Sequence, residues 1–529
     1  MRDFHRPGRS EVMATSAMAA TSMPAASLVA IETLKAGGNA ADAAVAAAAV
    51  LAVIEPQSTG IGGDCFCLYA PAGGEVVALN GAGRAPGAAT IDYFEAHGID
   101  RLDEESAHAV TVPGAVSAWE KLLETHGTMG FDEVLAPAIR MAEDGSPVHA
   151  RVASDWTEMA EKLARNGAHA LLPGGIAPAT GDVVRNPALA ASLRAIAKGG
   201  AAAFYEGAIA DDMVATLRAR GGLHTPEDFH DGRYAAAFVA PISLAWNGYR
   251  AWECPPPGVG LTALTMLGIL ERRGVAEGGP LDPLRLHRVA EAAKLAFRDR
   301  DALIGDDPAQ PVPVAELTSD AHLDALAAMM DDASVLPSPP FEAELPLHRD
   351  TAYLAVTDRD GNWCSFINSL FDDFGGGLYA ERSGVVFHNR GAGFRVERGH
   401  PNCIGPRKRP MHTIIPGLLT EGGVPMMAFG VTGGHFQPTG QSLLLGNVFD
   451  YGLDLQAALD LPRVFAHEGL LKLERGIPDE VARALAAKGH RLSYPARPHG
   501  GGQAIRLDRA RGVLIGASDP RRDGAAIGY

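Results

Sequence analysis

The sequence predicts an α+β protein, and two observations indicate this class. Patterns typical of helices dominate the chain up to about residue 330, and patterns typical of strands dominate it after residue 351. Residues 331–350 separate the two parts. They include four prolines and many polar residues, so we expect an extended surface segment with little regular structure.

Two helices and a short strand pair are expected near the N-terminus. Residues 25–36 are amphipathic and end at a Gly-Gly pair, after which Asn39 is suited to cap a second, alanine-rich helix that stops before Pro56. The apolar run 43–54 has 12 residues, fewer than the roughly 20 that cross a bilayer, so we expect no membrane helix. A glycine-rich turn then leads into strands at residues 65–69 and 76–79.

The later elements follow the same division. Helical patterns continue from residue 103 to about 272, and a long helix is expected over residues 284–303. Two strands, 351–358 and 363–368, are joined by the turn 359–362. Further strands are expected at residues 384–388, 414–419 and 425–431, and a helix from residue 441.

Composition excludes several classes of function. The formal net charge is −17 and aromatic residues make up only 6%, which argues against binding to nucleic acids or to anionic membranes. Five scattered cysteines, among them Cys65 and Cys67, form neither a disulfide framework nor a zinc pattern, so we expect buried thiols. The N-terminus lacks the apolar core of a secretion signal, so the expected location is the cytoplasm.

Thr351 is the candidate nucleophile that remains when common motifs are tested. The sequence contains no H-E-x-x-H and no G-x-S-x-G pattern. If the chain were cut before Thr351, the hydroxyl of this residue would be the nucleophile. Its new α-amine, with a pKa near 7.7–8.0, would be the base. A threonine at the start of a strand is also common without any such role.

A series of short blocks along nearly the whole chain resembles a known family. The blocks lie, in chain order, at residues 37–45 (GGNAADAAV), 55–63 (EPQSTGIGG), 80–86 (NGAGRAP), 112–114 (VPG), 291–297 (EAAKLAF), 389–394 (NRGAGF), 408–410 (KRP), 432–434 (TGG) and 516–520 (GASDP). Together they resemble the γ-glutamyltransferase family of N-terminal-nucleophile hydrolases.

The resemblance implies an inactive precursor that cleaves its own bond between Asp350 and Thr351. The products would be a large chain, residues 1–350, and a small chain, residues 351–529, held as one compact heterodimer. Whether two such heterodimers associate is left open by the sequence. The implied fold is a four-layer αββα sandwich. Thr351 would attack a small-molecule amide and form an acyl-enzyme, a chemistry that needs no metal or organic cofactor.

Three further catalytic residues are implied by their positions in the family's motifs. Ser369, 18 positions after Thr351, matches a hydroxyl residue that hydrogen-bonds the nucleophile (369 − 351 = 18). Gly433 and Gly434 match the glycines of an oxyanion hole, where backbone N–H groups must approach a developing negative charge. An ordinary strand-end serine and an ordinary glycine turn are the alternatives.

The positions that would bind the substrate depart from the family's pattern. Ala82 replaces the arginine that binds the α-carboxylate, and whether Arg84 takes over that role or is structural stays open. Gly393 replaces the aspartate that binds the α-amine, and Phe371 replaces an asparagine near the nucleophile. The candidate substrate-binding residues are Arg84, Asn389, Arg390 in place of a glutamine, and His412 and Thr413 in place of paired serines.

These departures predict an amidohydrolase or acylase for an acyl group that carries a carboxylate, with little demand for an α-amine. The stretch 394–405 also lacks the longer lid loop of typical members, so we expect an open site. A true glutathione hydrolase/γ-glutamyltransferase is the first alternative. An unprocessed, non-catalytic binding protein on the same scaffold is the second.

Overall fold

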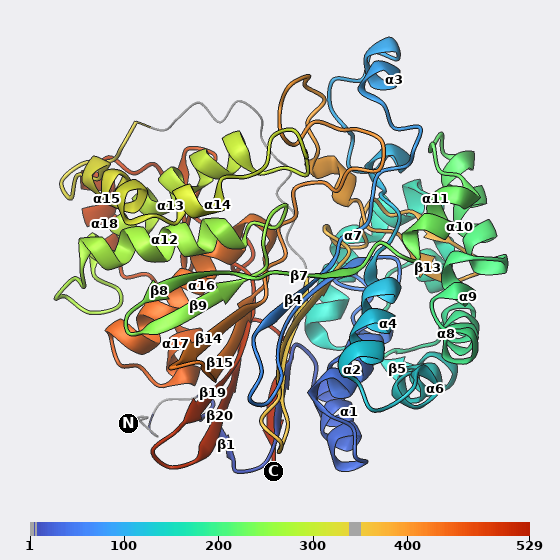
Figure 1. Cartoon of the computed structure of the whole chain (residues 1–529), viewed down its shortest axis with the longest axis horizontal. Helices are drawn as coiled ribbons and strands as arrows, with labels where there is room; N and C mark the ends of the chain where they lie inside the picture. Colours follow the sequence, from blue (N-terminus) through green and yellow to red (C-terminus); the bar gives the residue numbers. More distant parts are fainter. Residues whose placement is uncertain (1–4, 6–7, 338–350) are drawn as a thin grey trace.

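Two antiparallel seven-stranded sheets face each other in the middle of the computed structural model, which describes residues 5, 8–337 and 351–529 (Figure 1). The segment predicted at 331–350, with Asp350, lies mostly outside these residues. The strands of sheet I, in spatial order, are β21 (Ala525–Gly528), β2 (Met18–Thr21), β10 (Ala352–Thr357), β11 (Trp363–Ser369), β3 (Asp64–Ala70), β4 (Val77–Gly81) and β7 (Ala237–Val239). Those of sheet II are β1 (Val12–Ala14), β20 (Val513–Ser518), β19 (Gly502–Asp508), β15 (Val424–Val431), β14 (Gly417–Glu421), β9 (Tyr249–Glu253) and β8 (Ile242–Trp246).

Alternation along the strands builds the layer between the two sheets. Tyr353 and Ala355 of β10 point toward sheet II and pack in one buried cluster with residues such as Ala428 and Ile505. Their neighbours Leu354 and Val356 point to the other face and pack against helices. Every residue of β10, β11 and β3 is buried, so all three strands lie inside the molecule.

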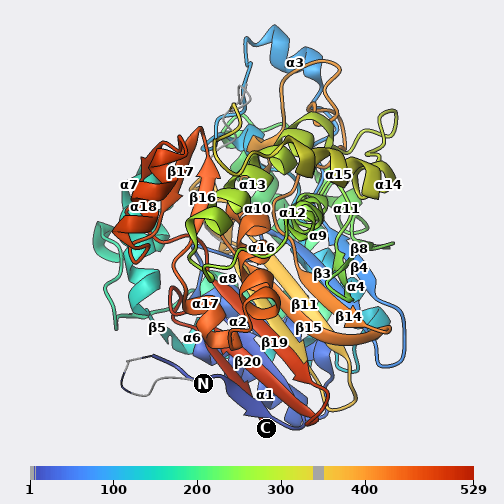
Figure 2. The ribbon, with the colours of Figure 1, turned by 90° about the vertical axis from the view of Figure 1, so that its left-hand side faces the viewer.

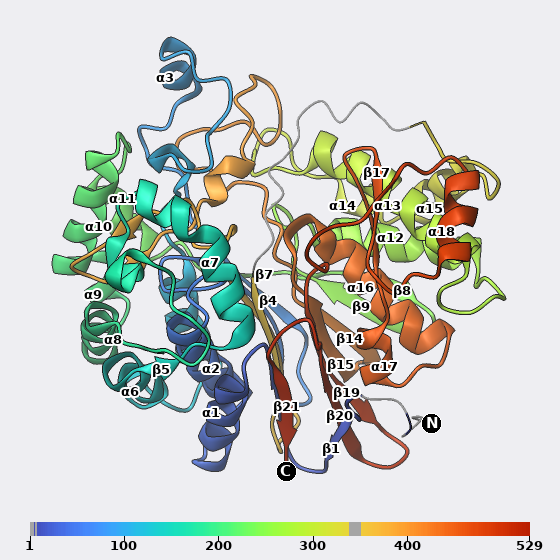
Figure 3. The ribbon, with the colours of Figure 1, turned by 180° about the vertical axis from the view of Figure 1, so that it is seen from behind.

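Helices cover the outer face of each sheet, which completes four layers in the order α-β-β-α (Figures 1 and 3). On sheet I these are α1 (Pro24–Lys35), α2 (Ala40–Ile54) and α4 (Ala115–His126). On sheet II they are α12 (Gly260–Arg273), α13 (Pro283–Leu303), α16 (Gln437–Leu445), α17 (Leu455–Asp460) and α18 (Asp479–Ala487), several of which lie in front of the sheet in Figure 2. The predicted four-layer sandwich is confirmed.

The N-terminal helices agree closely with their prediction. The Asn39 side chain accepts hydrogen bonds from the N–H groups of Ala41 and Asp42, and the Asp42 carboxylate accepts from the N–H of Asn39. Helix α2 is thin because alanine dominates it, so it packs between α1, α4 and sheet I with every residue except Val53 buried. None of the described helices has the length and hydropathy needed to cross a membrane.

The stretch 237–253 differs from its prediction, because it forms β7, β8 and β9 rather than helix. Strands β8 and β9 are joined by Asn247 and Gly248, both with positive φ (48° and 80°). An Asn-Gly pair between apolar residues is a strong hairpin signal, and it was present in the sequence. Helix α16 also starts at Gln437, four residues before the predicted start.

Peripheral helices surround the α1–α4 side of the molecule. They are α3 (Ile91–Ala96), α6 (Ala136–Asp144), α7 (Ala150–Arg165), α8 (Pro187–Gly199), α10 (Ala208–Ala219) and α11 (Pro226–Gly232). Residues from both sides of position 351 contribute strands to both sheets; β10, for example, pairs with β2 on one side and β11 on the other. The two parts of the chain are therefore interleaved.

Candidate active site

The β10–β11 hairpin brings Thr351 and Ser369 together at its open end, in the middle of sheet I. The register pairs Ala352 with Asn368, so the next residues outward are Thr351 and Ser369. Their hydroxyl oxygens lie 3.1 Å apart, within hydrogen-bond distance. Both side chains are buried. The spacing of 18 residues thus reflects one hairpin that holds a candidate nucleophile beside a second hydroxyl.

Arg390 connects this hydroxyl pair to the segment after the K-R-P block. Its Nη2 donates to Ser369 Oγ at 3.1 Å and its Nη1 donates to Thr413 Oγ1 at 2.8 Å. The guanidinium lies over the ring of Phe371, 4.4 Å from the ring centroid. Phe371, where the family pattern has an asparagine, also donates its backbone N–H to Ser369 Oγ at 2.9 Å.

The charge of Arg390 is buried and forms no direct ion pair with any residue that the structure describes. The side chain is fully buried, and its Nε has no hydrogen-bond partner among the described residues. Burial lowers the pKa of Arg390 to about 9, while Asp64 and Asp372 oppose this effect from a distance. The guanidinium therefore stays charged at neutral pH. A buried cation of this kind favours an anionic ligand, because a carboxylate would supply the missing counter-charge.

His412 and Asp64 form a second buried pair. His412 Nε2 lies 2.9 Å from the Asp64 carboxylate, and both side chains are fully buried. Burial raises the pKa of Asp64, but the nearby His388, His412 and Arg390 outweigh it and hold this pKa well below its usual range. Burial lowers the pKa of His412 to about 3, so its imidazole is neutral. Sequence reasoning missed Asp64, although a charged residue that opens a buried apolar strand was a usable signal.

Asn389 orders the loop beside the site. Its amide Nδ2 donates to the Asp372 carboxylate and to the backbone oxygen of Glu104, each at 3.0 Å. Burial and the Asp372 carboxylate raise the pKa of Glu104 to about 7. Through these contacts Asn389 stabilises the loop that follows Ser369.

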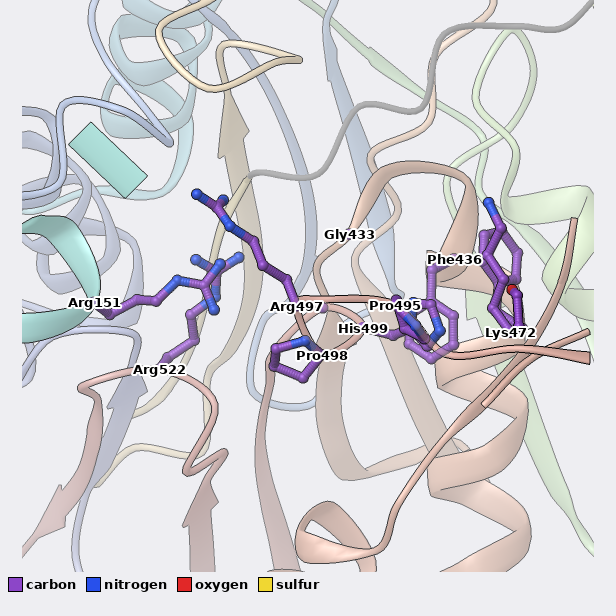
Figure 4. A pocket seen from close by; sticks show the side chains of 12 residues that line it. Arg151, Gly433, Phe436, Lys472, Pro495, Arg497, Pro498, His499 and Arg522 are labelled. Carbon is purple, nitrogen blue, oxygen red and sulfur yellow. The ribbon is translucent and has the colours of Figure 1, made fainter. Parts of the chain in front are cut away.

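Gly433 and Gly434 follow the end of β15 with φ angles of 113° and 59°, conformations that favour glycine. A Cβ atom on Gly433 would lie 3.0 Å from the Cα of Gly500. Gly433 lines a cavity of about 190 Å³. Figure 4 shows the side chains of Arg151, Arg497 and Arg522 on one side of this cavity and those of Phe436, His499 and Lys472 on the other.

Arg84 lies apart from this cluster. Its Nη1 donates to the backbone oxygen of Arg407 at 2.8 Å and lies 3.8 Å from the Asp306 carboxylate. The side chain is 39% exposed and lines a surface pocket with Tyr234. Of the two alternatives for Arg84, these contacts favour the structural role. The predicted cleavage-site residue Asp350 falls outside the described residues.

One group in the described part of the chain has the spacing of a metal site, formed by His287, Glu291 and His490. The His287 and His490 rings hydrogen-bond each other at 2.8 Å, and the Glu291 carboxylate binds Lys294 and the backbone N–H of Leu336. This network is satisfied by protein atoms. The cysteines are free thiols, buried except for partly exposed Cys403.

Comparison with known proteins identifies the family of this chain. The family model for gamma-glutamyltranspeptidase matches residues 26–529. The chain is 36% identical to the glutathione hydrolase-like YwrD proenzyme of Bacillus subtilis over 93% of this chain and 94% of that protein. It is 35% identical to the oxamate amidohydrolase proenzyme of Klebsiella pneumoniae over 98% and 99%.

A solved structure matches the whole chain. The crystal structure of cephalosporin acylase from Bacillus halodurans superposes with a TM-score of 0.92 at 36% identity, covering 100% of this chain and 99% of that one. Such likeness sets aside the non-catalytic binding protein. The chain therefore belongs to the gamma-glutamyltranspeptidase family of N-terminal-nucleophile hydrolases and is an amide-bond hydrolase made as a proenzyme.

Proposed function

We propose that this enzyme hydrolyses amides whose acyl group carries a carboxylate, and that Arg390 binds that carboxylate. The observation behind this proposal is the buried guanidinium, which contacts Ser369 and Thr413 but no carboxylate in the described residues. Because Ser369 also contacts Thr351, a carboxylate on Arg390 would hold its own acyl carbon near the nucleophile. Such positioning is a main source of catalysis in acyl transfer.

The chemistry begins with self-cleavage before Thr351, which frees the α-amine of this residue. The amine accepts the hydroxyl proton while the Thr351 oxygen attacks the substrate carbonyl carbon. Backbone N–H groups at Gly433 and Gly434 stabilise the oxyanion of the tetrahedral intermediate. The protonated amine then gives its proton to the departing nitrogen, and an ester between Thr351 and the acyl group remains. Water, activated by the same α-amine, hydrolyses this ester and releases the acid.

Discrimination against an α-amine follows from the side chains that are present. Gly393 has no carboxylate to pair with an ammonium, and a Cβ there would lie only 3.3 Å from the backbone oxygen of Met411. The two carboxylates that act on Arg390 are engaged by other side chains, Asp64 by His412 and Asp372 by Asn389. The name of the Klebsiella relative supports this substrate class, since oxamate is itself an amide with a carboxylate. A glutaryl amide or a small dicarboxylic half-amide fits better than glutathione.

The test compares three anilides that differ only in the acyl group: glutaryl, γ-glutamyl and uncharged butyryl. We expect the highest kcat/KM for the glutaryl anilide. Arg390→Gln should raise KM for that substrate about 10- to 150-fold, the loss expected for a charge-assisted hydrogen bond, with little effect on butyryl anilide. Arg84→Gln is the matched control, because Arg84 contacts Arg407 instead. A preference for the γ-glutamyl anilide would favour a glutathione hydrolase and overturn the proposal.

A further inference from the structure

Asp64 stands directly opposite Ser369 in sheet I, on the neighbouring strand β3. Its Oδ1 accepts hydrogen bonds from the backbone N–H groups of Gly83 and Gly114, each at 3.0 Å. Its Oδ2 accepts from His412 Nε2 at 2.9 Å. Three donors thus hold one fully buried carboxylate in a fixed orientation beside the catalytic hairpin.

Contacts from Asp64 lead around the site to the nucleophile. His412 is bonded to Asp64, and its chain neighbour Thr413 accepts from Arg390 at 2.8 Å. Arg390 then contacts Ser369, and Ser369 contacts Thr351, each at 3.1 Å. The pairing of β3 with β11 closes this path into a ring, because Ser369 lies opposite Asp64.

The Asp64 carboxylate also interacts electrostatically with the basic groups around the site. Among the described residues, the basic groups that feel its charge are Arg390, Arg409, His388 and His412. The same charge helps to raise the pKa of Cys65 and of Tyr205, which both stay neutral. Both histidines are neutral because burial lowers their pKa. Two guanidinium groups therefore depend on this carboxylate for part of their counter-charge. Arg409 is tied elsewhere, to the backbone oxygens of Ala82 and Ala235, whereas Arg390 faces the nucleophile.

When Asp64 is ionised, only one tautomer of the neutral His412 ring can donate to it. Nε2 must carry the hydrogen, since it faces the carboxylate, and Nδ1 is then bare. Nδ1 is buried and has no hydrogen-bond partner in the described part of the chain. An asparagine at position 64 would place an N–H₂ group against Nε2 and force the opposite tautomer, while its oxygen could still serve Gly83 and Gly114.

We propose that Asp64 is a positioning residue that sets acyl-group specificity by holding Arg390, through the His412–Thr413 segment, where it binds the substrate carboxylate. This inference rests on the proposed function. It assigns the discrimination between carboxylate-bearing and neutral acyl groups to a residue that does not touch the substrate.

The decisive variant is Asp64→Asn, measured after self-cleavage. We expect KM for glutaryl anilide to rise about 10-fold or more, kcat to change less than about 3-fold, and the kinetics on butyryl anilide to stay unchanged. Loss of a residue that merely stabilises the fold would change the kinetic constants for both substrates to the same extent. The matched control is Asp358→Asn, a buried aspartate that accepts backbone hydrogen bonds at the far end of the β10–β11 hairpin. It should lower the melting temperature without changing the glutaryl-to-butyryl ratio.

If Asp64→Asn does not fold or cleave itself, the variants His412→Gln and His412→Leu test the same inference. Glutamine keeps a donor for Asp64, so it should retain most of the preference for glutaryl anilide, whereas leucine should lose it. Equal preference in wild type and His412→Leu, or in wild type and Asp64→Asn, would overturn the inference. A wild-type enzyme without any preference for glutaryl over butyryl anilide would instead overturn the proposed function itself.

Discussion

The Thr351 and Ser369 hydroxyls lie 3.1 Å apart because they occupy the open end of a single antiparallel hairpin. Both strands of this hairpin are central in sheet I, with β2 on one side and β3 on the other. The distance between the two oxygens is therefore determined by backbone pairing rather than by flexible loops. Four predictions follow from this arrangement and its surroundings.

Self-cleavage is expected to depend on the Thr351 hydroxyl. Purified wild-type protein should resolve by intact mass in denaturant into chains of 350 and 179 residues (529 − 350 = 179). Thr351→Ala should remain a single 529-residue chain, because it has no nucleophile for the Asp350 carbonyl. Thr351→Ser keeps a hydroxyl and should cleave more slowly. Two chains from Thr351→Ala would show that another group, or a contaminating protease, makes the cut.

Ser369→Ala should slow catalysis more than it weakens substrate binding. The variant removes the hydroxyl beside the proposed nucleophile, Thr351, and leaves the Arg390 Nη2 donor without that acceptor. We expect kcat on glutaryl anilide to fall about 10-fold or more, which corresponds to roughly 1.4 kcal/mol. Ser369→Thr retains the hydroxyl and serves as the control. Unchanged kcat in the alanine variant would exclude a role for this hydroxyl.

Gly433→Ala should impair the reaction through the backbone. Alanine at φ 113° is strained, and its Cβ would meet the Cα of Gly500 at 3.0 Å, so the N–H groups that we propose bind the oxyanion would shift. We expect a roughly 100-fold loss of kcat, similar to loss of one oxyanion donor. Gly423→Ala is the control: φ there is 83°, but no atom lies within 4 Å. If both variants lose activity equally, general strain rather than the oxyanion site explains the effect.

Glu104 should make the folded state less stable as pH rises. Burial and Asp372 raise the pKa of Glu104 from 4.5 to about 7, so between these values the folded protein binds a proton that the unfolded chain has lost. This stabilisation is complete below pH 4.5 and is lost as pH rises through 7. Glu104→Gln should therefore raise the melting temperature relative to wild type at pH 8 but not at pH 4.5.

The neighbour Glu105 offers a control of opposite sign. Hydrogen bonds from Arg165 lower the pKa of Glu105, so its stabilisation is present above pH 4.5 and disappears as pH falls. Glu105→Gln should therefore lower the melting temperature at pH 8 and have little effect in acid. Parallel shifts in both variants would contradict the assignment for Glu104.

Much of the fold could be predicted because local signals agree with the tertiary structure. Asn39, the alanine run of α2 and the turn between β10 and β11 each specify their element within a few residues. Strands β8 and β9 were missed because an extended apolar stretch of five residues has no unique period, and only the Asn-Gly turn marked them.

The site divides in the same way. Thr351, Ser369 and the two glycines were predicted from their place in family motifs, and the structure places the two hydroxyls together. The placement of Arg84 on Arg407 and of Asp64 on His412 depends on contacts between segments about 320 to 350 residues apart. No local pattern encodes such a contact, so only the assembled sheets reveal it.

The interleaving of the strands has a consequence for how the enzyme can be regenerated after denaturation. Neither of the two predicted chains alone contains a complete sheet, since β10 and β11 insert between β2 and β3. The uncut precursor can refold as a unimolecular process, at a rate independent of protein concentration. Once the bond before Thr351 is broken, refolding requires two polypeptides to associate, so its rate depends on protein concentration. The folded state of the mature enzyme would thus be maintained by slow unfolding. After denaturation and dilution, the two chains would not recover the folded enzyme.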